Sequence, residues 1–280
     1  MKFNYVRPST EDELTKHLKN GGILFAGGTD IFVKLRAGII NPQLLIDSKN
    51  IPISPIEFEG EKLKIYMNNT YAELLENNEV KEKYPLLYKV ALSIGSTQIR
   101  NKGTMIGNIA NASPAGDFLL SSYLYDANVI IKPSNRIVPI QQFIKGPGKT
   151  DLSDGEYIYS LEFPYLENYK FYYEKVGRRN EMIIAIASLG ILLKCNDNNL
   201  IEDIRIAYGS VGPTVVRFKD YEKEFIGKEF REELFEKMAE SYKDRIRPID
   251  DVRGSADYRK KVVKNLLLKA YHNLAGDYKW

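Results

Sequence analysis

The pattern of apolar and charged residues changes near Pro164, and this change constrains the fold more than any other feature. Beyond it, apolar segments at residues 172–176, 184–193 and 201–208 predict successive strands of an antiparallel sheet. From Tyr221 onward, segments with charged faces predict helices. A run of strands followed by a run of helices indicates a separate α+β unit. A chain of 280 residues is long enough for two domains with separate cores, so we predict a domain boundary near residue 170.

The first half of the chain predicts short strands that alternate with helices. Ser9 or Thr10 begins a helix that ends at Gly21 and Gly22. Strands are predicted at residues 23–26, 44–46, 63–67 and 128–131, and helices at 31–35, from Thr70, from Pro85 to about Ser93, and at 118–125. Residues 95–117 show little periodicity and predict a long loop. Loops longer than about 12–15 residues inside a compact domain usually carry function.

A strand, a glycine turn and a helix meet at residues 24–30, which read Leu-Phe-Ala-Gly-Gly-Thr-Asp. Glycine lets main-chain N–H groups approach a ligand closely, and the start of the next helix offers further unpaired donors. This combination suits the phosphates of a dinucleotide. On this motif alone, an ordinary strand-to-helix turn with Asp30 as N-cap residue is the better interpretation.

A second motif covers residues 104–117, which read Thr-Met-Ile-Gly-Asn-Ile-Ala-Asn-Ala-Ser-Pro-Ala-Gly-Asp. Small and hydrogen-bonding residues make a poor core, but they can wrap a polar ligand with main-chain donors and side-chain amides. The alternative is a plain surface loop. It is less attractive because Ile109 and Ala110 lie among the polar residues.

Composition excludes several kinds of function. The 40 Lys and Arg residues are interspersed with 37 Asp and Glu residues, for a net charge of +3, so no nucleic-acid partner is expected. The single cysteine, Cys195, excludes an internal disulfide and a four-cysteine zinc or iron–sulfur site. His17 and His272 lie far apart in the sequence, so we expect no metal ligands.

Two familiar phosphate motifs are also excluded. Residues 148–150 read Gly-Lys-Thr, but the first glycine of a P-loop would fall at Phe143. No Gly-x-Gly-x-x-Gly is present, so a Rossmann site is not supported. No apolar run reaches about 18 residues and no signal peptide is recognisable. We therefore expect a cytoplasmic protein without direct membrane insertion.

Taken together, AGGTD at 26–30 and TMIGNIANASPAGD at 104–117 resemble the FAD-binding subunits of the xanthine dehydrogenase and carbon monoxide dehydrogenase family of molybdenum hydroxylases. Further segments follow the family's order: FNYVRPST at 3–10, QIRNKGT at 98–104, GEYIYSLEFPY at 155–165, EKVGRRNEM at 174–182 and DVRGSADYR at 251–259.

The resemblance implies an α+β fold with two domains. Residues 1–170 would form an FAD-binding domain of the PCMH/vanillyl-alcohol-oxidase type, with sub-domains at about 1–55 and 56–170. Residues 171–280 would form a C-terminal domain with an antiparallel sheet and helices.

The resemblance also assigns residues to the cofactor, FAD. Along its pyrophosphate and ribityl chain would lie Leu24, Phe25, Ala26, Gly27, Gly28, Thr29, Asp30 and Ile31. The other side of the diphosphate would contact Thr104, Ile106, Gly107 and Asn108. A polar group of the cofactor, such as an adenosine hydroxyl, would bind Asp117. The positions near its rings would be Ile94, Ile158 and Ile184, with Ile183 as the alternative to Ile184, and Lys175, with Glu174 as its alternative.

One position departs from the family. Where the family has TIGGN or TIAGN, Ile106 occupies the first small position. If that residue needed a positive φ, a β-branched side chain would be strained. We therefore expect Ile106→Gly to leave the FAD affinity unchanged or to raise it.

The function implied is that of an oxidoreductase subunit that relays electrons. They would pass from [2Fe–2S] clusters of a small subunit through FAD to an acceptor such as NAD or a quinone. A molybdopterin large subunit would perform the substrate chemistry, and the complex would be a dimer of heterotrimers. No catalytic residue is predicted in this chain, and the lone cysteine argues against the branch that reduces aromatic thioesters. Arg178 and Arg179 either guide an anionic acceptor or pair with carboxylates of a partner.

Two other functions stay open. One is a self-sufficient FAD oxidoreductase with its own substrate domain, and the other is an assembly subunit that has lost FAD. The substrate of a complex, whether purine, nicotinate, aldehyde or CO, would be selected in the molybdenum subunit. The segment Gly-Pro-Gly-Lys-Thr at 146–150 leans towards enzymes acting on heteroaromatic rings.

Overall fold

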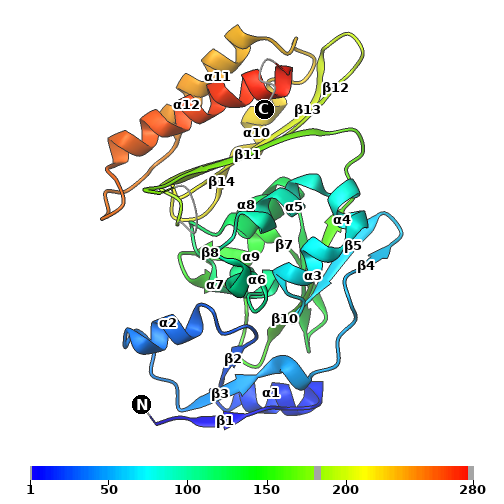
Figure 1. Ribbon diagram of the computed structural model, residues 1–280, viewed down its shortest axis with the longest axis vertical. Coiled ribbons are helices and arrows are strands. Elements are labelled where there is room, and N and C mark those ends of the chain that lie inside the picture. The colour runs from blue at the N-terminus through cyan, green and yellow to red at the C-terminus, as the bar shows by residue number, and fades with distance from the viewer. Residues whose placement is uncertain (1, 180–183, 277–280) are drawn as a thin grey trace. The chain divides into compact units, whose positions relative to one another are not determined.

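The computed structural model describes residues 2–179 and 184–276 (Figure 1). The chain forms two compact units that interleave along the sequence. The first unit consists of Met1–Asn78, Ile94–Ala112 and Asp126–Tyr165, and the second of Glu79–Ser93, Ser113–Tyr125 and Leu166–Trp280. The division near residue 170 drawn from the sequence stays a prediction, as do its two sub-domains.

The first unit begins with a three-stranded parallel sheet in the order β1-β3-β2. Its strands are β1 (Asn4–Val6), β2 (Ile23–Phe25) and β3 (Leu44–Asp47), and its helices are α1 (Glu11–Lys19) and α2 (Ile31–Arg36). Thr10 caps α1 by accepting a hydrogen bond from Glu13 N, as the sequence predicts. Leu35 of α2 packs with Phe25 and Leu45, so α2 lies on the sheet face that carries those two side chains.

A five-stranded antiparallel sheet forms the rest of this unit's framework, in the order β4-β5-β10-β6-β7. Its strands are β4 (Glu57–Glu59), β5 (Lys62–Tyr66), β6 (Asn128–Lys132), β7 (Arg136–Pro139) and β10 (Tyr157–Pro164), and a separate hairpin joins β8 (Ile144–Gly146) to β9 (Lys149–Thr150). The central strand, β10, was not predicted as a strand. The shorter helical elements of the unit are η1 (Ser48–Asn50), α3 (Tyr71–Glu76), α6 (Thr97–Arg100), α7 (Met105–Asn111) and α9 (Ile140–Phe143).

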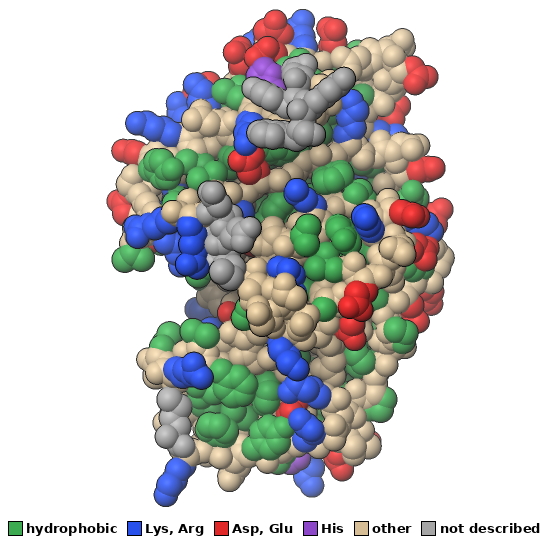
Figure 2. Space-filling model, viewed as in Figure 1, with side chains coloured by type: hydrophobic (Ala, Val, Ile, Leu, Met, Phe, Trp, Pro, Cys, Tyr) green, Lys and Arg blue, Asp and Glu red, His purple; other side chains and the backbone are tan. Residues whose placement is uncertain are grey.

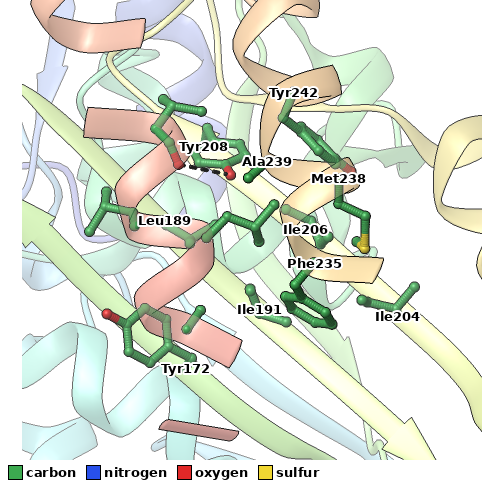
Figure 3. Close-up of a cluster of buried hydrophobic side chains, with 14 of the residues drawn as sticks. Tyr172, Leu189, Ile191, Ile204, Ile206, Tyr208, Phe235, Met238, Ala239 and Tyr242 are labelled. Carbon is green, nitrogen blue, oxygen red and sulfur yellow. Dashed lines mark hydrogen bonds between the residues drawn. The ribbon is translucent and has the colours of Figure 1, made fainter. Parts of the chain in front are cut away.

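The second unit is built on a four-stranded antiparallel sheet. Its strands are β11 (Lys170–Val176), β12 (Ala187–Cys195), β13 (Ile201–Gly209) and β14 (Val216–Arg217), and its helices are α4 (Asn78–Lys83), α5 (Pro85–Leu92), α8 (Asp117–Leu124), α10 (Lys219–Lys223), α11 (Glu232–Arg245) and α12 (Ala256–Ala275). The two long helices, α11 and α12, cover one face of the sheet. On that face, Phe235 of α11 shares a buried core with the strand residues Leu189, Ile191, Ile206 and Tyr208 (Figure 3).

Helix α8 packs on the β12 and β13 part of this sheet. A Cβ atom on Gly190 would lie 2.6 Å from the side chains of both Leu120 and Leu124, so α8 approaches β12 where that strand has no side chain. Successive residues of a strand face opposite sides. Gly190 therefore faces α8 while Leu189 and Ile191 face the long helices, which explains why β12 is apolar almost throughout.

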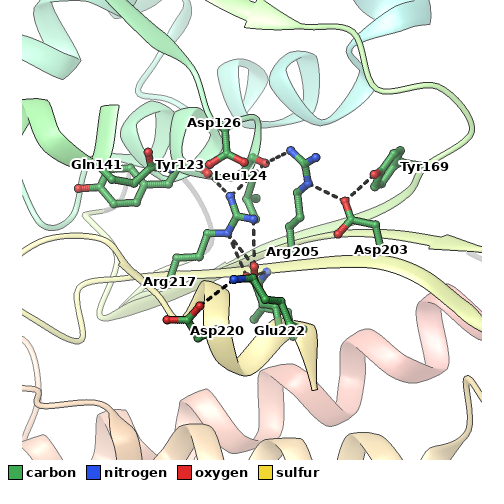
Figure 4. A network of polar contacts seen from close by, with 12 residues as sticks. Tyr123, Leu124, Asp126, Gln141, Tyr169, Asp203, Arg205, Arg217, Asp220 and Glu222 are labelled. Carbon is green, nitrogen blue, oxygen red and sulfur yellow. Dashed lines mark hydrogen bonds and ion pairs between the residues drawn. The ribbon is translucent and has the colours of Figure 1, made fainter. Parts of the chain in front are cut away.

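A buried ion pair fixes the C-terminal end of α8 (Figure 4). Arg217 pairs with Glu222, and both side chains are almost fully buried. Arg217 also donates to the carbonyl oxygen of Tyr123 at 2.6 Å, and Arg205 donates to that of Leu124 at 3.0 Å. The last carbonyls of a helix have no partner within the helix, so these two arginines attach α8 to the sheet of the second unit.

The predicted fold class is confirmed, and most elements lie where the sequence places them. The long loop predicted for residues 95–117 is wrong, because α6 and α7 form within it. The helix predicted from Thr70 is interrupted at Asn77, where α3 ends and α4 begins. Within the described ranges, no helix is both long enough and apolar enough to cross a membrane.

Candidate cofactor site

Gly27, in the turn between β2 and α2, lies directly against the main chain of residues 102–103. A Cβ atom on Gly27 would be 1.8 Å from the carbonyl oxygen of Lys102 and 3.1 Å from the Cα of Gly103. No side chain fits at this distance. The glycine turn therefore touches the segment that leads into the second motif, although about 75 residues separate them in sequence.

The turn presents a row of main-chain donors. Gly28 has a φ of +75°, a conformation that favours glycine. Within the described part of the chain, the main-chain N–H groups of residues 27–30 have no hydrogen-bond acceptor. Asp30 occupies the N-cap position of α2, but its side chain makes no capping hydrogen bond to that helix. Asp30 is therefore the N-cap residue, as the sequence predicts, but its side chain leaves the main-chain donors of the turn unsatisfied.

The facing segment is held in place by its own contacts. Tyr71 N donates to the carbonyl oxygen of Gly103 at 3.1 Å, and Thr70 and Thr104 form an isolated β-bridge. The Thr104 hydroxyl accepts a hydrogen bond from Gly107 N at 3.0 Å and caps α7. Thr104 and Gly107 are thus positioned by the start of a helix, in place of the loop that the sequence predicts.

Helix α7 is anchored by one face and accessible on the other. Its buried residues are Met105, Ile106 and Ile109. Gly107 is exposed and Asn108 is half-buried, so both lie on the accessible side. At the far end of the helix, Lys34 of α2 donates to the side-chain oxygen of Asn111. The turn–α2 segment and the Lys102–α7 segment therefore meet at both ends.

This arrangement fits the phosphates of FAD. The free N–H groups of residues 27–30 are donors that an anion requires, and the glycines let the turn lie directly against Lys102 and the Phe32 ring. Of the other assigned residues in the first unit, Phe25 and Ile158 are buried, whereas Leu24, Ile31 and Ile94 are half-buried. Ala26 and Thr29 lie in the turn itself.

Asp47, at the end of β3, lies beside the end of β2 and was missed by sequence reasoning. It lies opposite Phe25 in the sheet and is buried. It accepts hydrogen bonds from Tyr5 at 2.6 Å and from Arg7 at 2.8 Å, and Lys49 also binds it. Burial opposes ionisation, but these hydrogen bonds outweigh it and hold the pKa of Asp47 at about 2. Tyr5 and Arg7 belong to the segment FNYVRPST, so part of that motif binds the Asp47 carboxylate.

In the second unit, Asp117 and Lys175 form an ion pair of 2.8 Å whose two side chains are each 10% exposed. Lys175 also donates to the carbonyl oxygen of Ser93 at 2.8 Å. Burial raises the pKa of Asp117, and the charge of Lys175 opposes that rise. The other carboxylate oxygen, Oδ1, is buried and has no hydrogen-bond partner among the described residues. Because the Tyr173 hydroxyl also interacts with this carboxylate and Oδ1 is not exposed, the contact of Asp117 with a cofactor hydroxyl stays a prediction.

The neighbouring residue, Glu174, faces a different element. It pairs with Lys269 of α12 at 2.8 Å, whereas Lys175 pairs with Asp117 of α8. The structure therefore associates Lys175, and not Glu174, with another assigned residue. Ile184 is 63% exposed in the segment before β12, and its alternative, Ile183, lies outside the described residues. Contact of any of these residues with FAD stays a prediction.

The expected strain at Ile106 is absent. Ile106 lies inside α7 and does not have a positive φ. Its side chain is 6% exposed and belongs to the buried face of the helix. The reason for expecting Ile106→Gly to be harmless is therefore wrong, because an isoleucine suits this helical, buried position.

We now predict that Ile106→Gly destabilises the protein by roughly 3–5 kcal/mol, through lost burial and the poor helix propensity of glycine. Ile106→Val, which keeps the branched side chain, should cost only about 0.5–1.5 kcal/mol. Urea unfolding of the FAD-free protein measures both. Equal stability of Ile106→Gly and the original chain would contradict this assignment of the side chain to the core.

Comparison with known proteins identifies the family. Residues 1–166 match the model of the FAD binding domain in molybdopterin dehydrogenase, and residues 171–274 match that of the CO dehydrogenase flavoprotein C-terminal domain. In the described ranges, no group of three or more His, Cys, Asp or Glu side chains is placed to hold a metal ion.

Individual relatives agree over the whole length. The glyceraldehyde dehydrogenase medium chain of Sulfolobus acidocaldarius is 34% identical over 280 residues, covering 98% of this chain and 99% of the relative. The carbon monoxide dehydrogenase medium chain of Hydrogenophaga pseudoflava is 28% identical and covers 96% of each chain.

The solved structure of carbon monoxide dehydrogenase from Hydrogenophaga pseudoflava gives a TM-score of 0.93 at 26% identity, covering 100% of this chain and 99% of that one. The chain therefore belongs to the family of FAD-binding medium subunits of molybdenum hydroxylases.

Proposed function

We propose that this chain relays electrons from the [2Fe–2S] clusters of a small partner subunit, through FAD, to an acceptor such as NAD or a quinone. A large molybdopterin subunit performs the substrate chemistry, and the assembly is a cytoplasmic dimer of heterotrimers. The observation that carries the proposal is the contact between the two glycine-containing segments, with free main-chain donors at residues 27–30 in the described chain.

The residues of the chain hold the cofactor and perform no bond chemistry of their own. The main-chain donors of residues 27–30, with the exposed Gly107 of α7, would hold the diphosphate. When bound, FAD accepts electrons singly and gives them up as a pair. The single cysteine, Cys195, cannot supply a cluster of its own, so electrons reach the chain from a partner.

The relatives supply the first substrates to examine. The relative at 34% identity is the medium chain of a glyceraldehyde dehydrogenase. Aldehydes should therefore be tested as substrates of the complex before purines and nicotinate. A self-sufficient FAD oxidoreductase is the second candidate, and it differs from the proposal in needing no partner subunit.

We predict that Gly27→Ala lowers the FAD affinity by roughly tenfold or more, because the added methyl group forces the turn away from Lys102. Gly38→Ala is the matched control. Gly38 has a positive φ, but its Cβ would meet no atom of the described residues within 4 Å. That variant should lose about 1 kcal/mol of stability and keep its FAD affinity. Titration of the FAD-free protein, followed by flavin fluorescence, measures the FAD affinity of both variants. Equal affinity of Gly27→Ala and the original chain contradicts the assignment of this turn to the FAD site.

We also predict that the isolated chain with FAD is not reduced by aldehydes, purines or nicotinate. After reduction with dithionite and removal of the excess, the same protein should pass electrons to an artificial dye or to NAD. Stopped-flow absorbance of the flavin measures both reactions. Bleaching of the flavin by any of these substrates without partner subunits would establish the self-sufficient oxidoreductase instead.

A further inference from the structure

Large apolar side chains are concentrated on the surface of the first unit near α2. Five of the fifteen exposed large hydrophobic residues of the described chain fall within residues 3–39. They are Phe3 (39% exposed), Tyr5 (51%), Phe32 (42%), Val33 (64%) and Ile39 (70%). We call these five residues the α2 face. Scattered exposed hydrophobic residues need no explanation, but a concentration of them marks an interaction surface.

Most of the α2 face is continuous. Phe3 and Tyr5 are two residues apart on an extended segment and point to the same side. The ring of Tyr5 lies 6.3 Å from that of Phe25, which lies 5.3 Å from that of Phe32. Figure 2 shows hydrophobic side chains gathered over the part of the first unit where Figure 1 labels α2 and β3, with Lys and Arg side chains at the margin.

The charges beside the α2 face are mainly positive. Arg7 and Lys49 both bind Asp47, so two cations share one carboxylate and leave an excess of positive charge. Their side chains are 44% and 45% exposed. Helix α2 itself carries Lys34 and Arg36 and no acidic residue. The surface is therefore apolar with a basic margin.

We propose that the α2 face binds a partner subunit whose own surface is apolar with acidic residues at its edge. Charge complementarity selects this occupant over a second copy of the chain. A two-fold dimer through the same patch would bring the Arg7 and Lys49 side chains of both copies together. The inference rests on the proposed function, because only a subunit of a complex has such a partner.

The test is assembly with the [2Fe–2S] small subunit and the molybdopterin large subunit of the proposed complex. The double variant Val33→Glu and Ile39→Glu places two negative charges on the α2 face and replaces no assigned cofactor residue. The matched control is Ile249→Glu and Val252→Glu, whose side chains in the second unit are 71% and 84% exposed. Sedimentation equilibrium of the mixed subunits gives the affinity, and absorbance gives the FAD content of each chain.

The α2-face variant should bind FAD like the original chain but assemble with an affinity lower by roughly tenfold or more, while the control assembles normally. If the α2-face variant assembles as the original chain does, the proposed binding surface is wrong, whereas the proposed function stands. If the original chain self-associates and the α2-face variant does not, the α2 face binds a second copy of this chain, and the proposed partner is wrong. Failure of the original chain itself to assemble overturns the proposed function and the surface together.

Discussion

The close approach of Gly27 to the main chain of Lys102 is the constraint on which the cofactor site depends. It brings a turn of the parallel sheet against a segment fixed by Tyr71 N and Thr70. Any side chain at position 27 would separate them. The consequence is a row of free donors at residues 27–30 of the described chain, next to the segment that leads into α7, which suits an extended diphosphate.

The sequence predicts the elements that have strong local patterns. Thr10 and Thr70 mark helix starts because their side chains cap the first turn, and the strands of the second unit stand out as apolar runs. Helices α6 and α7 were missed because they are short: α6 has four residues and α7 has seven, and α7 also contains Gly107, Asn108 and Asn111. Strand β10 was missed because the buried polar residues Ser160 and Glu162 interrupt its apolar run.

The candidate site was predictable only in part. The sequence predicts a turn at Gly27 and Gly28, because glycines follow a strand and precede a helix there. The contact of Gly27 with Lys102 depends on tertiary packing, which no local pattern indicates. The Asp117–Lys175 pair joins residues 58 positions apart, and no local pattern indicates it. At Ile106, comparison with the family pattern suggested strain, whereas the helical backbone and the buried environment accommodate a large side chain.

Amide hydrogen exchange with and without FAD tests the central claim most directly, because it reports on the main-chain donors themselves. The free N–H groups of residues 27–30 should exchange quickly in the FAD-free protein and at least roughly tenfold more slowly once FAD is bound. Amides of β12, which are already paired in the second unit's sheet, serve as the reference. Bound FAD that leaves the exchange of residues 27–30 unchanged would contradict the account.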